Sequence, residues 1–160
     1  LKGDFAIIAL QAVVDKMPKS LQSKTRPLEN EKSMRWDNFK IKAIPMYNIT
    51  EDRLKFHTKG RGNGYVISIA NERIYFSGDT EDIPEMRSLK KIDHAFICMN
   101  LPYTMTVESA IDAVLEFKPK KVYPYHYRGT EGLSDVSKFK SVINEKNKNI
   151  EVIQWNWYPN

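Results

Sequence analysis

Apolar and polar residues follow two different periods along the chain. In the first half, apolar positions recur at every second residue over short runs, which predicts β-strands with one face in water. In the second half, apolar runs alternate with segments whose apolar residues stand at i, i+3 and i+4, which predicts buried strands separated by amphipathic helices. The predicted strands cover residues 5–10, 34–36, 39–44, 65–69, 73–76, 92–99, 121–125 and 150–155, and the predicted helices cover residues 11–17, 107–117 and 135–146.

Residues that favour helix starts stand before several of these segments. Thr106 and Ser134 directly precede the two long helices, where a side-chain oxygen accepts a hydrogen bond from the first turn. Thr80 is followed by two acids and by Pro84, so we expect it to cap a further short helix.

Two segments show no clear periodicity. Residues 19–32 are polar, carry Pro27 and are expected to form an exposed connection. Residues 45–63 hold several turn-forming residues, and a loop of this length in a compact protein is usually functional or mobile. Hairpin strands come first in the chain and strand–helix alternation follows. This order predicts an α/β fold with a mixed sheet and helices on its outside.

The composition indicates a globular protein with one domain. The chain has 160 residues, of which 41% are hydrophobic, enough for a real core. No apolar run reaches the length of a membrane-spanning helix, and the first residues lack the pattern of a signal peptide. We therefore expect a cytoplasmic protein with no membrane partner, with a removed leader left open. Cys98 is the single cysteine, which excludes an internal disulfide and predicts a buried thiol.

The net charge of +5 comes from short lysine runs with acids between them. The chain has no nucleic-acid motif and no arginine-rich arm. We therefore interpret the lysine runs as solvated faces and expect no nucleic-acid partner.

Two strand ends carry residues that are typical metal ligands. Strand 73–76 runs into Asp79, and strand 121–125 runs into His126. One strand–helix crossover lies between them, so neighbouring strand ends could bring the carboxylate and the imidazole to the same edge of the sheet. The pair is a ligand set for zinc, manganese or iron, although two ligands are too few for a tight site. An ordinary turn acid and a packed histidine are the alternative interpretation.

Several segments resemble, in the same order, the later half of metallo-β-lactamase-fold hydrolases, and they are most similar to the branch of the ascorbate-phosphate lactonases. These segments are Gly62-Asn63-Gly64-Tyr65-Val66, Ile74 to Thr80, Ile83-Pro84-Glu85-Met86, Ile92-Asp93, Tyr103-Thr104-Met105-Thr106 and Tyr123-Pro124-Tyr125-His126-Tyr127. The resemblance covers nearly the whole chain. It implies an αββα sandwich with a metal pair at one edge, and a metal-dependent hydrolase of a small ester, lactone or phosphorylated compound.

The resemblance also implies metal roles for two residues. In the family, the acid of the Gly-Asp-Thr segment bridges two metal ions and the histidine of the later segment binds the second ion, so these roles fall on Asp79 and His126. Water bound in such a centre is acidified towards neutrality and becomes a hydroxide nucleophile. Zinc, or manganese or iron, is the cofactor implied for the intact protein.

The chain departs from the family in its histidines. The first metal motif of the family, His-x-His-x-Asp-His, is absent, and His57, His94 and His126 do not have its spacing. Asn48 stands where many members have a further histidine. It is either a weak oxygen ligand or a turn residue, and we favour the turn. His94 lies in a strand where the family usually has an apolar residue, so we expect a structural role for it.

Further residues are candidate neighbours of the substrate or the metal. His57, in the long loop, lines a substrate mouth or is simply exposed. Tyr127 and Arg128, beside the predicted metal histidine, could orient a ligand or bind an anionic substrate. Thr80 follows the predicted metal acid directly.

Because the first motif is absent, the chain resembles the C-terminal two-thirds of such a hydrolase, and residues 1–160 are expected to form a single, incomplete domain. We then expect weak or absent metal binding by this chain alone. Uncovered strand edges and apolar patches would associate with a second copy or with the missing N-terminal segment. The alternative function is a catalytically inactive domain with a binding or assembly role. A truncation and a natural short protein are both open.

Overall fold

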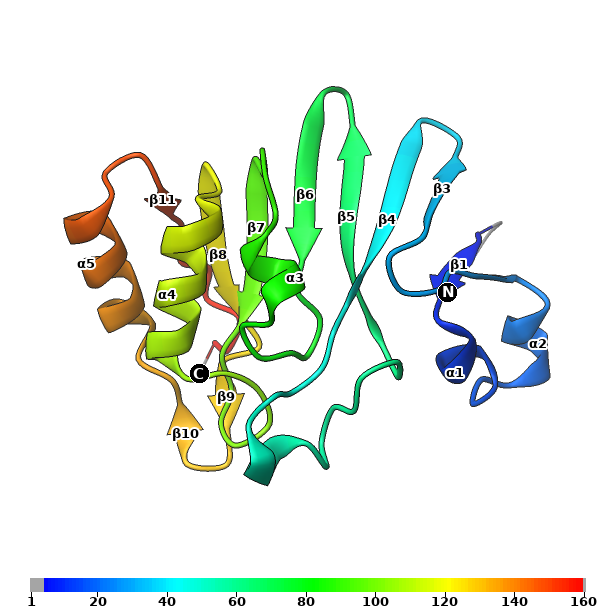
Figure 1. Ribbon diagram of the computed structural model, residues 1–160, viewed down its shortest axis with the longest axis horizontal. Helices are drawn as coiled ribbons and strands as arrows, with labels where there is room; N and C mark the ends of the chain where they lie inside the picture. Colours follow the sequence, from blue (N-terminus) through cyan, green and yellow to red (C-terminus); the bar gives the residue numbers. More distant parts are fainter. Residues whose placement is uncertain (1–4, 160) are drawn as a thin grey trace.

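The computed structural model describes residues 5–159 and contains one large mixed sheet (Figure 1). Its strands are, in spatial order, β11 (Glu151–Val152), β8 (Lys121–Tyr125), β7 (His94–Cys98), β6 (Glu72–Phe76), β5 (Asn63–Ile69), β4 (Phe39–Pro45) and β3 (Ser33–Trp36). Strands β3 to β6 pair antiparallel, whereas β6, β7, β8 and β11 run parallel because helices connect them. The predicted α/β fold with a mixed sheet is confirmed.

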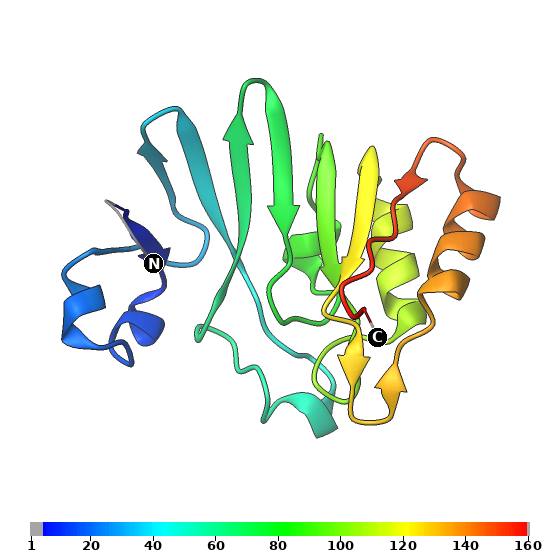
Figure 2. The same cartoon turned by 180° about the vertical axis from the view of Figure 1, so that it is seen from behind.

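The helices that connect the parallel strands lie on one face of the sheet (Figures 1 and 2). They are α3 (Pro84–Arg87), α4 (Val107–Phe117) and α5 (Val136–Lys146). Thr106 caps α4 as predicted, because its side chain accepts a hydrogen bond from the Ser109 amide at 3.0 Å. The predicted cap of α5 is wrong by one residue. Asp135 caps this helix, since the Ser134 hydroxyl donates instead to the Met99 carbonyl.

The main core lies between these helices and the sheet. Tyr75 of β6 and Ile97 of β7 face Val114 and Phe117 of α4 and Phe139 of α5, and all five side chains are at most 3% exposed. Burial of each such side chain contributes about 1.5–3 kcal/mol. The same core contains Cys98, as predicted, and burial raises the pKa of its thiol.

The opposite face of the parallel strands, here called the aromatic face, carries Phe76, Phe96, Tyr123, Trp155 and Trp157. Phe96 stacks between Phe76 and Tyr123, with ring centroids 4.7 Å apart on each side. The C-terminal segment crosses this face in Figure 2 and brings Trp155 within 4.9 Å of Tyr123. Trp155 remains 47% exposed and Trp157 42% exposed, so the C-terminal segment covers the aromatic face only in part.

The N-terminal part differs from its prediction. Its elements are β1 (Ile7–Ala9), α1 (Gln11–Val14), α2 (Lys19–Gln22) and β2 (Thr25–Pro27), and β1 pairs parallel with β2. The predicted connection at residues 19–32 therefore contains a helix and a strand, which no apolar period marks because most of their side chains are exposed. A small cluster of Leu28, Ile41 and Ala43 joins this part to the sheet.

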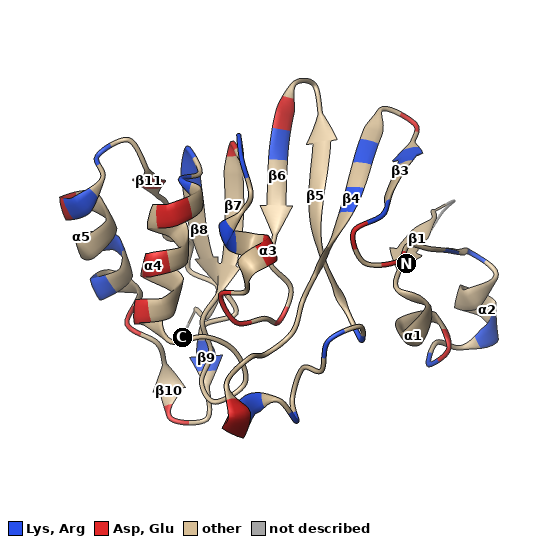
Figure 3. Cartoon of the chain, viewed as in Figure 1, with Lys and Arg blue, Asp and Glu red and all other residues tan. Residues whose placement is uncertain are grey.

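Other differences concern short elements. The predicted last strand, 150–155, is reduced to the two residues of β11, because the chain then leaves the sheet edge and crosses the aromatic face. The short elements missed by the prediction are η1 (Glu51–Arg53), β9 (Arg128–Gly129) and β10 (Gly132–Leu133). Basic and acidic residues are interspersed over the elements (Figure 3). Among residues 5–159, no helix is both long and apolar enough to cross a membrane.

Candidate functional site

The parallel strands β6, β7 and β8 end at the same edge of the sheet, and each is followed by a polar residue. Asp79 follows β6 after a two-residue turn, Asn100 follows β7, and His126 comes directly after β8. Ligands of open α/β sheets bind outside the carboxyl ends of the strands. This strand-end edge, at the bottom of the sheet in Figure 1, is the candidate functional site.

Asp79 and His126 are in direct contact at the strand-end edge. Nδ1 of His126 lies 2.8 Å from Oδ1 of Asp79. The Asp79 side chain is 36% exposed and the His126 side chain 40% exposed, so neither side chain belongs to the core. The prediction that both residues lie at one edge of the sheet is confirmed, and a common opening stays a prediction.

Asn100 determines which nitrogen of His126 carries the proton. The Thr104 hydroxyl donates to Oδ1 of Asn100 at 2.7 Å, which leaves the Asn100 amide nitrogen, 3.2 Å from Nε2 of His126, as a donor to the ring. Nε2 therefore accepts, and Nδ1–H donates to Asp79. Asn100 is only 2% exposed, so its own orientation is fixed. The imidazole is held at both nitrogens.

The backbone at the edge adopts left-handed conformations. His126 has a φ of +45° and Gly78 a φ of +66°. Glycine adopts this region freely, whereas for histidine it costs of order 1–3 kcal/mol. Such residues persist where the surrounding structure over-determines them, and they cluster at functional sites.

A segment without regular pairing faces this edge. Residues 46–62, here called the loop wall, join β4 to β5. Within it, Asn48 is 2% exposed and donates through Nδ2 to the carbonyls of Arg53 at 3.0 Å and Tyr103 at 2.7 Å. These two acceptors fix the amide orientation and leave its Oδ1 buried without a hydrogen-bond partner among residues 5–159. The favoured turn interpretation of Asn48 is wrong, because the buried side chain links two backbone carbonyls through Nδ2 and leaves Oδ1 as a free acceptor.

A buried carboxylate anchors the loop wall. Glu81 accepts hydrogen bonds from the amides of Ile49 and Thr50 and from Arg53, all at 2.6 Å. Burial works to raise the pKa of Glu81, but the Thr50 and Ile49 amides and the Arg53 guanidinium outweigh it and hold the pKa below its usual value. The loop wall is thus attached to the segment that carries Asp79.

Thr80 strengthens the same attachment. Its hydroxyl donates to the Tyr47 carbonyl at 2.9 Å and accepts from the Tyr47 amide at 3.1 Å, and the residue is fully buried. The predicted capping role is wrong, since α3 begins at Pro84 and its N-cap position, Ile83, uses no side-chain hydrogen bond. Thr80 connects the loop wall to the end of β6.

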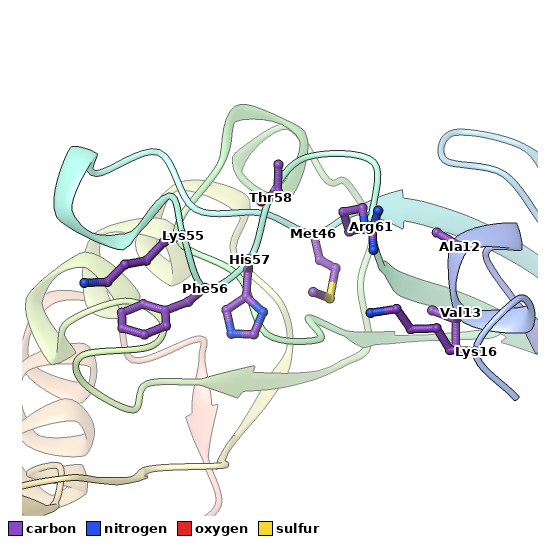
Figure 4. A pocket seen from close by; sticks show the side chains of 9 residues that line it. All are labelled: Ala12, Val13, Lys16, Met46, Lys55, Phe56, His57, Thr58 and Arg61. Carbon is purple, nitrogen blue, oxygen red and sulfur yellow. The ribbon is translucent and has the colours of Figure 1, made fainter.

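His57 extends from the loop wall towards the edge. Its carbonyl accepts a hydrogen bond from the Asn48 amide at 2.8 Å. Burial lowers the pKa of His57, while the charge of Asp79 raises it and that of His126 lowers it. His57 also lines a cavity of about 500 Å³ between the loop wall and α1 (Figure 4).

Tyr127 and Arg128 contact the C-terminal segment. The Tyr127 ring is 6% exposed, packs edge-on against Tyr158 at 5.0 Å and donates its hydroxyl to the Trp155 carbonyl. The Arg128 guanidinium lies over the Tyr158 ring, 4.3 Å from its centroid. Neither side chain forms a hydrogen bond or ion pair with Asp79 or His126. At the far end of β7, His94 contacts the Tyr123 hydroxyl at 3.1 Å, which fits the structural role expected for it.

Asn100 is the site residue that sequence reasoning missed. It follows the end of β7 by two residues, as His126 follows β8 directly, so the rule that parallel strand ends share an edge could have identified it. In the part of the chain that the structure describes, no group of three or more His, Cys, Asp or Glu side chains is arranged to hold a metal. Any further ligand would therefore have to be an amide or backbone oxygen, water, or a group outside this set.

Comparison with known proteins places the chain in a family. The profile of the β-lactamase superfamily domain matches residues 5–127. A UPF0173 metal-dependent hydrolase of Thermococcus onnurineus is 31% identical over 115 residues, which are 69% of this chain and 50% of that protein. The homologue of Pelotomaculum thermopropionicum is 32% identical over 120 residues, 69% of this chain and 52% of that protein. The chain spans about half the length of the curated relatives it matches.

Solved structures agree with this match. A proposed metal-dependent hydrolase from Parabacteroides distasonis is 40% identical, with a TM-score of 0.84 over 96% of this chain and 65% of that chain. Igni18, a metallo hydrolase from Ignicoccus hospitalis, is 20% identical, with a TM-score of 0.75 over 94% of this chain and 65% of its own, and shows the same fold. By its profile match over most of its length, and in agreement with the resemblance seen in its motifs, this chain belongs to the β-lactamase superfamily.

Proposed function

We propose that Asp79 and His126 form part of the metal centre of a metal-dependent hydrolase. The observation that carries the proposal is their contact at the strand-end edge, with both side chains partly open to solvent and the imidazole fixed by Asn100. The names of the relatives, metal-dependent hydrolases, support the same reaction class. The proposed activity of the whole protein rests on these site residues, because a fold alone does not determine a function.

The donor set fits a divalent metal. A carboxylate and an imidazole are donors that zinc, manganese and iron accept. Asp79 uses Oδ1 to hold His126, and Oδ2 accepts no hydrogen bond from residues 5–159. Asn48 Oδ1 is a further buried oxygen without a partner on the facing wall. We propose zinc, or manganese or iron, as the metal, and Asn48 as an additional oxygen ligand.

The residues of the chain have separate tasks in this proposal. A bound metal would act as a Lewis acid and lower the pKa of its bound water towards 7, so that hydroxide is present at neutral pH. Asp79 and His126 would hold that ion, for which the imidazole would have to give up its hydrogen bond from the Asn100 amide and present Nε2 to the metal. The loop wall would limit access of bulk water from the opposite side. The proposed substrate is a small ester, lactone or phosphorylated compound, as the resemblance to lactonases implies.

The test is a titration of the purified chain with Zn²⁺ and Mn²⁺ by calorimetry. Asp79→Asn and His126→Gln should each lower the metal affinity by about 100-fold or more, because loss of an outer-shell partner alone costs about 10–100-fold. Asp93→Asn and His94→Gln are matched controls, because this Asp-His pair lies at the opposite end of β7. The controls should stay within about twofold of the original chain. Equal losses in all four variants would contradict the proposal.

The absolute affinity is part of the same proposal. A mononuclear zinc site normally takes three or four protein ligands. We therefore propose that this chain alone binds metal weakly, and that the intact centre needs a further ligand set. Hydrolysis assays on lactones and phosphodiesters should use the longest polypeptide that carries these residues.

A role in assembly is the second candidate function. The observation that favours it is the aromatic face, where Trp155 and Trp157 remain exposed next to a stack of three aromatic rings. We propose that a second copy of the chain covers this face. Light scattering should show a dimer, and a monodisperse monomer would contradict it.

A further inference from the structure

The cavity beside His57 has the size of a small-molecule site. Its volume is about 500 Å³, within the range of about 300–1,000 Å³ that ligand pockets occupy. One wall is α1, with Val13, and the turn that follows it, with Lys16; the other is the loop wall, with Met46, His57 and Arg61 (Figure 4). The lining does not include Asp79 or His126, so this cavity is not the same site as the strand-end edge.

The charges that line the cavity are all positive. Lys16, Lys55 and Arg61 are part of the lining, and no acidic residue is. Lys16 and Arg61 extend towards each other from opposite walls and approach the Met46 thioether, whereas the Lys55 ammonium points away beyond the Phe56 ring (Figure 4). Two cations thus converge on one region of the cavity, and the third does not.

The converging cations have no counter-ion in the described chain. Neither Lys16 nor Arg61 forms an ion pair with any residue between 5 and 159. Two like charges that approach each other repel, and an oxyanion placed between them removes the repulsion. An arginine fork binds carboxylate or phosphate through two parallel hydrogen bonds, and a lysine adds a point charge.

The remaining lining suits an apolar group. Val13 and Phe56 are each 36% exposed, and together with Met46 they provide an apolar surface beside the cations. Ligand sites commonly combine such a surface with a few polar groups that fix orientation. The expected ligand is therefore a small molecule with an apolar body and one anionic end.

We propose that this cavity binds the anionic end of the substrate, with Lys16 and Arg61 holding a carboxylate or phosphate group. The inference rests on the proposed function, because it assigns the substrate of the strand-end edge to small anionic esters or lactones. His57 is part of the cavity lining and belongs to the loop wall, which faces the Asp79–His126 pair.

The test is a titration of the metal-free chain with phenyl phosphate, benzoate and the neutral benzyl alcohol at constant ionic strength, followed by ¹H–¹⁵N NMR. The original chain should bind at least one of the two anions and bind benzyl alcohol at least about tenfold more weakly. Arg61→Gln and Lys16→Gln should each weaken anion binding at least about fivefold. Lys55→Gln removes the same charge from the same cavity but from the side chain that points away, and should change the affinity less than twofold.

The outcomes separate the alternatives. Binding of phenyl phosphate alone assigns a phosphoryl group, binding of benzoate alone assigns a carboxylate, and either supports the proposal. It is overturned if neither anion binds, if benzyl alcohol binds equally well, or if Lys55→Gln weakens binding as much as Arg61→Gln does. Because no metal is present, loss of anion binding with metal binding intact overturns this subsite only. Intact anion binding without metal binding overturns the proposed metal centre only.

Discussion

The two sides of the candidate site are built differently. The ends of three hydrogen-bonded parallel strands carry Asp79, Asn100 and His126. The loop wall carries His57 and Arg61, and among residues 5–159 most of it pairs with no strand. The strands are backed by the main core, so their ends are held by burial. The loop wall is held by polar contacts to Glu81, Thr80 and the Tyr103 carbonyl and leaves apolar side chains exposed.

This difference suggests that the strand ends bind the metal and that the loop wall recognises the substrate. Groups that hold a metal need fixed geometry, which a strand end supplies. Groups that recognise a substrate are often on loops, which vary in sequence without disturbing the core. Variants at the strand ends should therefore affect kcat and metal affinity, whereas variants in the loop wall should affect KM.

The largest expected effect concerns turnover. In the polypeptide that carries these residues, Asp79→Ala should lower kcat by about 10³-fold or more, since a metal ligand contributes several kcal/mol to the transition state. Arg61→Gln should raise KM and leave kcat within about threefold, because it removes binding that is equal in the ground and transition states. Steady-state kinetics on an anionic ester measures both. The comparison fails if Arg61→Gln lowers kcat as strongly as Asp79→Ala.

The next effect concerns the orientation of His126. Asn100→Ala removes the amide that donates to Nε2 and should raise metal affinity by up to about tenfold, because this amide competes with the metal for the Nε2 lone pair. Thr104→Val keeps the shape but removes the hydroxyl that orients Asn100, and should cause a smaller gain. Calorimetric titration with Zn²⁺ gives both values. Unchanged or lower affinity in Asn100→Ala would show that this amide does not compete with the metal.

A further effect is expected on the stability of the loop wall. Glu81→Gln weakens charge-assisted hydrogen bonds to Arg53 and to the amides of Ile49 and Thr50, and should cost about 2 kcal/mol of unfolding free energy. Denaturant unfolding measures the loss. Hydrogen exchange should accelerate at these two amides more than in β7, and uniform acceleration would argue against a separately anchored loop.

The smallest effect is expected in the core behind the strand ends. The Tyr75 hydroxyl is buried without a hydrogen-bond partner among residues 5–159, and burial raises the pKa of Tyr75 well above its usual value. Tyr75→Phe removes an unsatisfied polar group and should leave stability unchanged or raise it by up to about 1 kcal/mol. A loss of more than about 1 kcal/mol in thermal or denaturant unfolding would reveal a partner for this hydroxyl.

Sequence reasoning predicted the parallel half well because its apolar periods are those of buried elements. Helix α4 and strands β6 to β8 follow such periods, and strand–helix alternation places their ends at one edge. The proximity of Asp79 and His126 followed from this order, and the family resemblance added the metal roles.

The same reasoning failed where polar contacts decide the structure. Strand β2 lies in a polar segment and has no apolar period to reveal it. The buried Asn48 side chain donates to two backbone carbonyls, those of Arg53 and Tyr103. One lies in an irregular segment and the other is distant in the chain, so no local sequence pattern predicts these hydrogen bonds. Ser134 and Asp135 are both good capping residues, and only the Met99 carbonyl, 35 positions away in the chain, determines which of them is used.

The most direct test of the metal centre is anomalous X-ray scattering from crystals of the chain soaked in Zn²⁺. The account predicts an anomalous peak within about 2.0–2.2 Å of an Asp79 carboxylate oxygen and a ring nitrogen of His126. A map with no peak at this pair, or with peaks only at His94 or elsewhere on the surface, would contradict it.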